Sequence, residues 1–321
     1  MANSTSKKIR NIALTLIGIA IFIGVYAYIG FDKILNVMQN RLSLLVIVYA
    51  VMLTFINMII RAWRWDIILA NFEQAKIRFI RLLGYTFAGG FLANITPGKI
   101  GELGKSYFLK RNHGISLRHG LPSIMIEKLA DIIVTAGIAI FFIFSFIYKL
   151  NIFYTCIILL AYIILVIAGF LLTKLFSYKI TNIGFIKRFM QKKNLEPKEV
   201  DYIFARMSGF GFISKTVILT FIIWIIGAWR LMIIGEALGI KLSFIYYIMI
   251  IAISLFVGGI SLIPSGIGIN DAVMIYLFNM MGGSLELYGA ATLANTMLSV
   301  FLVNMIGGVL FIVLFGRVKK G

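Results

Sequence analysis

Long stretches without a charged residue are the feature that most limits how this chain can fold. Residues 11–31 and 42–60 contain no Asp, Glu, Lys or Arg. A helix of about 20 residues spans the roughly 30 Å hydrocarbon core of a bilayer, because each residue adds about 1.5 Å. Further apolar stretches follow at 122–148, 151–173, 213–235 and 287–316. The pattern predicts an all-α polytopic membrane protein.

The composition is also that of a membrane protein. Apolar residues make up 61% of the chain, charged residues make up only 13%, and the mean hydropathy is +0.99. Soluble domains average roughly 45–50% apolar and about 25% charged residues. A soluble protein of this composition would lack the polar surface needed to cover its apolar helices. We therefore expect a single transmembrane domain over residues 1–321.

The excess of 31 Lys and Arg over 12 Asp and Glu would suggest nucleic-acid binding in a soluble protein. No aromatic–basic RNA motif accompanies it. We therefore expect the cations in cytoplasmic loops and against anionic lipid headgroups, with no nucleic acid as a partner. The single Cys156 lies inside an apolar stretch, which excludes a disulfide framework. His113 and His119 have no neighbouring acids, so we expect no metal site and no cofactor.

The distribution of Lys and Arg predicts how the chain crosses the membrane. Basic residues are concentrated at both termini and in segments 61–81, 99–118 and 174–206. The opposite loops contain only Lys33, Arg41, Lys149 and Lys241. Because cytoplasmic loops collect basic residues, both termini are expected in the cytoplasm. The stretch 11–31 is too long for a signal peptide and lacks a cleavage pattern, so we expect it to remain as the first membrane span. Together with the other apolar stretches it predicts a multi-pass protein of the cell (inner, cytoplasmic) membrane.

Segment 61–81 is expected to lie at the membrane surface. The sequence "RAWRW", residues 61–65, has the composition of an interfacial belt of aromatic and basic side chains. Residues 66–81 mix apolar positions with charged ones, which predicts a helix lying on the membrane surface.

Two similar phrases interrupt the apolar sequence. They are "ANITPGKIGELGK", residues 93–105, and "SLIPSGIGINDA", residues 261–272. The first phrase ends a segment, 82–105, that begins and ends on the cytoplasmic side, so that segment must enter the membrane and return. Segment 244–281 must do the same from outside. Pro and Gly break a helix, and broken backbone at membrane depth is tolerated only where protein or a wet cavity satisfies it.

The sequence around each phrase is also repeated. "IIRAWRWDIIL", residues 59–69, aligns with "IIGAWRLMIIG", residues 225–235, and Pro97 then aligns with Pro264. We interpret this as two inverted-topology repeats, each with a Pro/Gly-broken re-entrant helical hairpin, as in many transporters. The first repeat covers 41–148, a linking span and a basic cytoplasmic segment cover 149–212, and the second repeat covers 213–316. Chance similarity between apolar segments is the alternative.

The first phrase has the chemistry of an anion site. A second half-helix is expected to begin near Glu102, and its positive N-terminal end can face an anion. Lys99 and Lys105 add charge at the same place. A phosphate group is the expected ligand. We expect Lys105 to bind the phosphate and Glu102 to pair with the basic residues at the entrance of the site. A nucleotide-binding loop is disfavoured because no P-loop motif is present.

A second group of charges lies in "PSIMIEKLADIIVTAG", residues 122–137. Glu127 and Asp131 are four residues apart and share one helix face, and Lys128 can pair with Asp131. Asp131 is expected near the middle of the bilayer, where an acid should face the bundle interior. These residues form either a polar lining for a headgroup or an internal salt bridge that fixes packing. The corresponding polar positions of the second repeat are Asn295 and Ser299.

Several of these motifs occur together in a known family. They are Arg61 and Arg64 in "RAWRW", Asn94-x-x-Pro97-Gly98-x-x-Gly101-Glu102-x-x-Lys105, Ser116, Glu127-Lys128-x-x-Asp131, and Pro264-Ser265-Gly266-x-Gly268-x-Asn270-Asp271. In this the chain resembles the lysylphosphatidylglycerol synthase transmembrane-region family, also called flippase-like or UPF0104 proteins. The resemblance and the residue analysis together suggest as headgroup-binding residues Arg61, Arg64, Asn94, Pro97, Gly98, Lys99, Gly101, Glu102, Lys105, Glu127, Lys128, Asp131, Pro264, Ser265, Gly266, Gly268, Asn270, Asp271 and Asn295.

The resemblance implies a lipid flippase or a related lipid-handling membrane protein. We expect the chain to move or bind an anionic envelope lipid, phospholipid or polyprenyl-phosphate-linked, with the lipid tails left in the bilayer. We expect no catalytic residues, because no nucleophile–base set or paired metal-binding acids stand out. The alternatives are a membrane-anchored partner subunit of a lipid- or sugar-modifying enzyme, docking through 174–212, and a lipid transferase. The sequence leaves the oligomeric state open.

Overall fold

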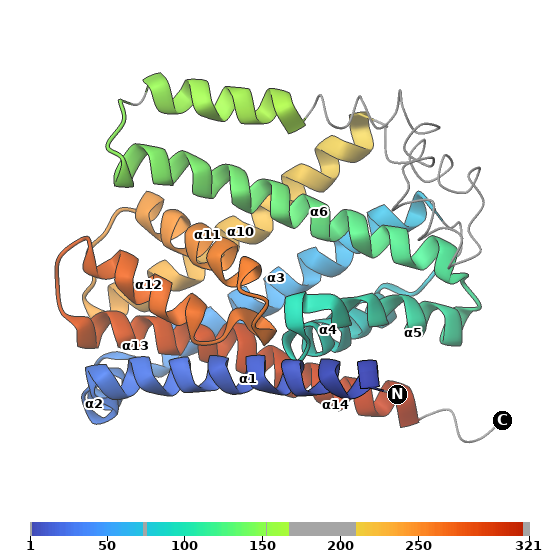
Figure 1. The fold of residues 1–321 in the computed structure, drawn as a ribbon, viewed down its shortest axis with the longest axis horizontal. Coiled ribbons are helices and arrows are strands. Elements are labelled where there is room, and N and C mark those ends of the chain that lie inside the picture. The colour runs from blue at the N-terminus through green and yellow to red at the C-terminus, as the bar shows by residue number, and fades with distance from the viewer. Residues whose placement is uncertain (1, 73–75, 152, 167–209, 317–321) are drawn as a thin grey trace.

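The computed structural model describes residues 2–72, 76–151, 153–166 and 210–316. This part of the chain is helical and contains no β-strand (Figure 1). The elements of the first half are α1 (Ala2–Ile29), α2 (Phe31–Arg41), α3 (Leu44–Ala70), α4 (Phe79–Asn94), the 3-10 helix η1 (Pro97–Leu103), α5 (Gly104–His113), α6 (Leu117–Phe142) and the π turn η2 (Ile143–Ile147). Those of the second half are α10 (Phe210–Leu238), α11 (Phe244–Ile260), η3 (Pro264–Gly266), α12 (Ile269–Asn279), α13 (Leu285–Thr296), the π turn η4 (Met297–Phe301) and α14 (Leu302–Gly316).

Five helical segments are long and apolar enough to cross a membrane, among the residues described. They are Ile12–Ile29, Leu44–Ala70, Leu117–Ser145, Gly211–Leu238 and Leu285–Leu314. Two shorter apolar helices, Phe153–Val166 and α11, accompany them. The prediction of an all-α polytopic membrane protein is confirmed. The basic segment proposed for partner docking, 174–212, lies outside the described residues except for its last three positions.

Local sequence explains where several helices begin and end. Ser43 caps α3, since its side-chain oxygen accepts a hydrogen bond from the amide of Val46, and Ser116 caps α6 in a related way through Arg118. Gly30 separates α1 from α2 with a φ of 100°, a conformation that glycine adopts without steric cost.

Segment 61–81 does not form the interfacial belt and surface helix that the sequence predicts. The apolar helix does not end near residue 60 but continues as α3 to Ala70, and the next helix, α4, starts only at Phe79. The "RAWRW" residues therefore lie inside a spanning helix. Arg64 and Trp65 are fully buried there, whereas Trp63 faces outward. Ion pairs described below make burial of this arginine tolerable.

Both Pro/Gly phrases break the chain into hairpins. Helices α4 and α5 form one hairpin around η1, and α11 and α12 form the other around η3. In Figure 1 the first hairpin occupies the end of the bundle where α1 begins and α14 ends, and the second occupies the opposite end. The turns η1 and η3 contact each other. The second half-helix of the first hairpin begins at Gly104, two residues later than expected.

The helices of the two halves pack on one another in a reciprocal way. Helix α3 packs along α10, α4 packs against α14, and α11 packs against α6. Each hairpin thus contacts the last long helix of the other half. The largest hydrophobic core joins residues of α10, α11, α12 and α13 with buried side chains of α1 and α2. Smaller clusters join α3, α4, α5 and α6.

The contact between α4 and α14 depends on one glycine. A β-carbon at Gly307 would lie 2.3 Å from the carbonyl oxygen of Phe87 and 2.9 Å from the β-carbon of Phe91, both on α4. At the adjacent Gly308 the nearest atoms, in the ring of Phe91, would be 3.5–3.8 Å away, which is ordinary contact.

Gly307→Ala should therefore destabilise the protein by about 1–3 kcal/mol, because the two helices must move apart. Gly308→Ala should leave stability unchanged or raise it slightly, since alanine favours the helix by about 1 kcal/mol. Thermal unfolding in detergent at one heating rate, followed by tryptophan fluorescence, measures both. Equal unfolding temperatures for the two variants would contradict the packing described.

Candidate functional site

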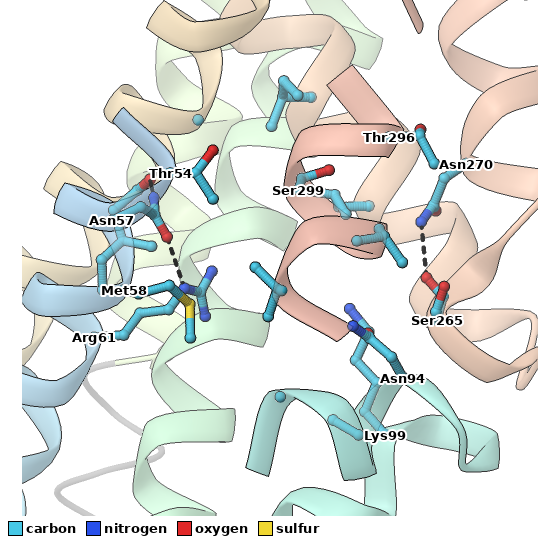
Figure 2. Close-up of a pocket in the computed structure, with 18 of the residues that line it drawn as sticks. Thr54, Asn57, Met58, Arg61, Asn94, Lys99, Ser265, Asn270, Thr296 and Ser299 are labelled. Atoms are coloured by element: carbon cyan, nitrogen blue, oxygen red, sulfur yellow. Dashed lines mark hydrogen bonds between the residues drawn. The ribbon is translucent and has the colours of Figure 1, made fainter. Parts of the chain in front are cut away.

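A polar cavity of about 190 Å³ lies where the two turns meet inside the bundle. Helices of both halves contribute to its wall. Figure 2 shows Thr54, Asn57 and Arg61 on one side, Ser265, Asn270 and Thr296 on the other, and Asn94 with Lys99 at the turn η1. The predicted site residues that line it are Arg61, Asn94, Lys99, Glu102, Glu127, Lys128, Ser265, Asn270, Asp271 and Asn295.

A network of ion pairs lies beside this cavity. Arg64 of α3, only 1% exposed, bonds Asp131 at 2.6 Å and Glu127 at 3.1 Å, both on α6. Lys105 of α5, with no exposed surface, pairs with the same Glu127 and with Glu102 at 3.2 Å. Glu127 therefore links the cations of two different helices. These contacts hold α3, α5, α6 and η1 in one arrangement.

Two more cations complete the network. Lys128 pairs with Glu102, and not with Asp131 as its position in the sequence suggested. Asp131 is instead shared by Arg64 and by Arg61, whose Nη1 lies 3.9 Å from the carboxylate. Each acid thus faces at least two cations.

The expected role of Lys105 as a phosphate ligand does not fit its position. Its side chain lies behind the cavity wall, over the ring of Trp65 at 4.5 Å and between the two glutamates. Gly89 of α4 makes room for it, since a β-carbon there would lie 2.5 Å from the Cγ of Lys105. In this arrangement the ammonium group of Lys105 is used by the two glutamates and does not line the cavity.

Arg230 of α10 has a sequence context and a hydrogen bond similar to those of Arg64 in α3. It occupies in "GAWRL" the position of Arg64 in "RAWRW", and it is 6% exposed. Arg64 donates to Thr220 of α10 at 2.8 Å, and Arg230 donates to Thr54 of α3 at 3.3 Å. Each threonine lies ten residues before the arginine of its own helix. The two antiparallel helices therefore exchange equivalent hydrogen bonds.

The surroundings of the two arginines differ in charge. Where Arg64 meets two carboxylates, Arg230 meets the amide oxygen of Asn295 at 3.0 Å. Within the described residues no acid lies at ion-pair distance from Arg230, and it lines the cavity. In the sequence this arginine aligns with Arg64, but it is not among the predicted site residues. The sequence did contain a signal for it. Asn295, the position of the second half that corresponds to Glu127, has an amide in place of the carboxylate.

Both turns share an unusual backbone. After Pro97, Gly98 and Lys99 have φ values of 61° and 56°, and after Pro264, Ser265 and Gly266 have values of 57° and 69°. Positive φ is costly for a residue with a β-carbon, and such strain is concentrated at functional sites. Lys99 and Ser265 are the residues that bear this cost, and both line the cavity.

The remaining predicted residues near the turns have structural contacts. Gly101 donates its amide to the hydroxyl of Thr96 at 2.7 Å. Asp271 accepts hydrogen bonds from Tyr26 of α1 at 2.9 Å, from Thr296 of α13 at 2.7 Å and from the amide of Gly268 at 3.1 Å. Asp271 thereby caps α12 and ties it to α1 and α13.

Three polar atoms of the cavity wall have no hydrogen-bond partner in the described structure. They are the hydroxyl of Ser265, the amide oxygen of Asn270 and the indole nitrogen of Trp224. Asn270 uses its amide nitrogen to bond the carbonyl of Ser265 at 3.1 Å. A buried polar group without a partner costs about 1–3 kcal/mol. The wall therefore offers unused donors and acceptors to a polar guest.

Glu127→Gln tests the network. The change leaves Arg64 and Lys105 with too little negative charge, and breaking a buried pair in this way costs about 3–5 kcal/mol. A large drop in the thermal unfolding temperature in detergent is expected. Adding Lys105→Met to Glu127→Gln should restore part of the lost stability, because it removes a buried cation that has lost one of its two carboxylates.

Glu236→Gln is the control, since Glu236 is exposed on α10 and has no cation at ion-pair distance among the described residues. Its unfolding temperature should equal that of the unmodified protein. A Glu127→Gln protein as stable as this control would show that the network does not hold the helices together.

Comparison with known proteins agrees with this architecture. A UPF0104 membrane protein of Pyrococcus horikoshii is 25% identical over 291 residues, covering 83% of this chain and 85% of the relative. A UPF0104 membrane protein of Methanocaldococcus jannaschii is 26% identical over 293 residues, with 84% of each covered. The sequence model of the lysylphosphatidylglycerol synthase transmembrane region matches residues 15–307. The chain therefore belongs to the lysylphosphatidylglycerol synthase transmembrane-region family of multi-pass membrane proteins.

Proposed function

We propose that this protein binds the anionic headgroup of a membrane lipid in the polar cavity and moves the lipid between the two leaflets. The observation that carries the proposal is the unpaired Arg230. A buried cation without a carboxylate is expensive in the interior of a protein. A phosphate group would supply the missing charge, and arginine binds phosphate through paired, charge-assisted hydrogen bonds.

Other residues of the cavity support an anion as the guest. Lys99 lines it, and the described residues place no carboxylate at ion-pair distance from this lysine. Arg61 bonds Asn57 at 2.9 Å and lies only at 3.9 Å from Asp131, so it keeps donors for a ligand. The acids Glu102 and Glu127 are already shared among other cations.

Transport is favoured over catalysis by the chemistry of the wall. Neither His nor Cys lines the cavity in the described part of the chain. The carboxylates of the wall are engaged elsewhere, since Glu102 and Glu127 are held in ion pairs and Asp271 accepts three hydrogen bonds, so none of them is free to activate a hydroxyl group of the wall. We therefore propose that the lipid leaves chemically unchanged.

The reciprocal architecture supports an inverted repeat with both termini in the cytoplasm. The equivalent hydrogen bonds of Arg64 and Arg230, the matching backbones of η1 and η3, and hairpins at opposite ends of the bundle are what such a repeat requires. A site between two opposed hairpins could then open to either side in turn. The concentration of Lys and Arg assigns the side of α5 to the cytoplasm.

Cysteine labelling tests this topology. In a Cys156→Ser background, a cysteine replacing Lys110, exposed on α5, should react with an impermeant maleimide only from the cytoplasmic side. A cysteine replacing Asn279, exposed at the end of α12, should react only from outside. Right-side-out and inverted vesicles give the two measurements. Labelling of both positions from one side would rule out the inverted arrangement.

Arg230→Gln tests the headgroup site. In proteoliposomes, exchange of a chain-labelled phosphatidylglycerol between leaflets, read by dithionite quenching, should slow by about tenfold or more. A lost charge-assisted contact costs about 1.5–3 kcal/mol, and each 1.4 kcal/mol is a factor of ten. Arg78→Gln removes an equal charge from an exposed position of the same chain and should leave the rate unchanged.

The same assay separates transport from its alternatives. Mass spectrometry of the recovered lipid should show an unaltered mass, whereas a changed mass would indicate a transferase. Unmodified protein that exchanges lipid no faster than empty liposomes would refute the transport proposal.

A further inference from the structure

A second, apolar pocket lies next to the polar cavity. This groove has a volume of about 590 Å³ and is walled by α6, the helix Phe153–Val166, α10 and α11. Its volume falls within the roughly 300–1,000 Å³ range of small-molecule sites. Leu129 and Ile163 on its wall are more than two-fifths exposed, so the groove opens to the surface that faces the bilayer.

The groove offers a guest almost nothing polar. Its hydroxyl groups are engaged elsewhere, since Tyr162 bonds the carbonyl of Ile133 at 2.7 Å and Thr216 bonds that of Phe212 at 2.9 Å. An extended peptide in this groove would bring N–H and C=O groups that the wall cannot satisfy. A hydrocarbon chain has no such groups.

Trp224 of α10 joins the two pockets, because it lines both. On the side of the cavity the guanidinium of Arg61 lies over its ring, 5.6 Å from the centroid. The indole nitrogen is buried and has no partner within the described structure. Tryptophan combines an apolar body with one N–H donor and is suited to the border between hydrocarbon and polar groups.

We propose that the groove holds a hydrocarbon chain of the same lipid whose headgroup occupies the cavity, with Trp224 at the junction of headgroup and chain. This inference rests on the proposed function and narrows its substrate to a lipid bound partly inside the protein. It differs from the expectation that the tails remain in the bilayer. The unpartnered indole N–H would then donate to an oxygen of the linkage between headgroup and chain.

Photocrosslinking tests the position of the chain. The probe is phosphatidylglycerol with a diazirine midway along one chain, in nanodiscs that contain the full-length protein. Adducts located by mass spectrometry should be more frequent on groove residues of α6 and α10, such as Ile133 and Val217, than on the neighbouring, lipid-facing Ile218.

Two substitutions on adjacent residues supply the matched control. Val217→Trp fills the groove and should lower labelling of the α6 peptide by about tenfold, because overpacking excludes the chain. Ile218→Trp adds similar bulk to the lipid-facing side, where Ile218 is 57% exposed, and should leave the labelling of the α6 peptide unchanged. Equal unfolding temperatures for the two variants would show that Val217→Trp still folds.

The outcomes separate this inference from the headgroup site. Adducts spread evenly around the lipid-facing helices, or unchanged by Val217→Trp, would overturn the groove assignment even if Arg230→Gln still slows lipid exchange. Groove adducts that Val217→Trp removes support it. If those adducts persist at full strength in Arg230→Gln, the chain site stands and the headgroup site fails. If Arg230→Gln weakens them, one lipid occupies both pockets.

Discussion

Buried ion pairs between α3, α5 and α6 are the constraint on which the rest of the structure depends. Removing an ion from water costs several kcal/mol, and only well-placed partners compensate for this cost. Glu127 compensates two cations at once, from two helices far apart in sequence. The hairpin of α4 and α5 must therefore seat itself so that Lys105 reaches Glu127, which places η1 against the turn of the other half.

Around Arg230 in the second half, the negative charge found beside Arg64 is missing. Arg230 keeps the threonine partner that Arg64 has, while an amide takes the place of the acid. The buried arginine of one half is thus paired with carboxylates and that of the other is not. Trp224 also separates two pockets of different polarity. The cavity on one side is lined by cations and amides, and the groove on the other is lined by apolar side chains. The proposed headgroup and hydrocarbon-chain sites rest on these two differences.

The sequence reveals features that depend on neighbours along the chain. Uncharged stretches predict the spanning helices, and a Pro followed by Gly residues predicts each break, since these effects act over a few residues. The sequence does not reveal that the side chain of Lys105 lies outside the cavity, because that position depends on the space beside Gly89 on another helix. Arg64 was assigned to an interfacial belt because nothing near it in sequence reveals Glu127, its partner 63 positions away. The importance of Arg230 similarly depends on Asn295, which is 65 positions away.

The strained turn at Lys99 has a consequence for engineering. Glycine accepts a positive φ at no steric cost, and the second turn has Gly266 at the corresponding position. A stability-guided redesign would therefore select glycine at position 99, and it would remove a cation that lines the cavity. Under the proposed function thermostability and headgroup binding oppose each other at this residue, so a screen that scores folding alone would select against a cation of the proposed site.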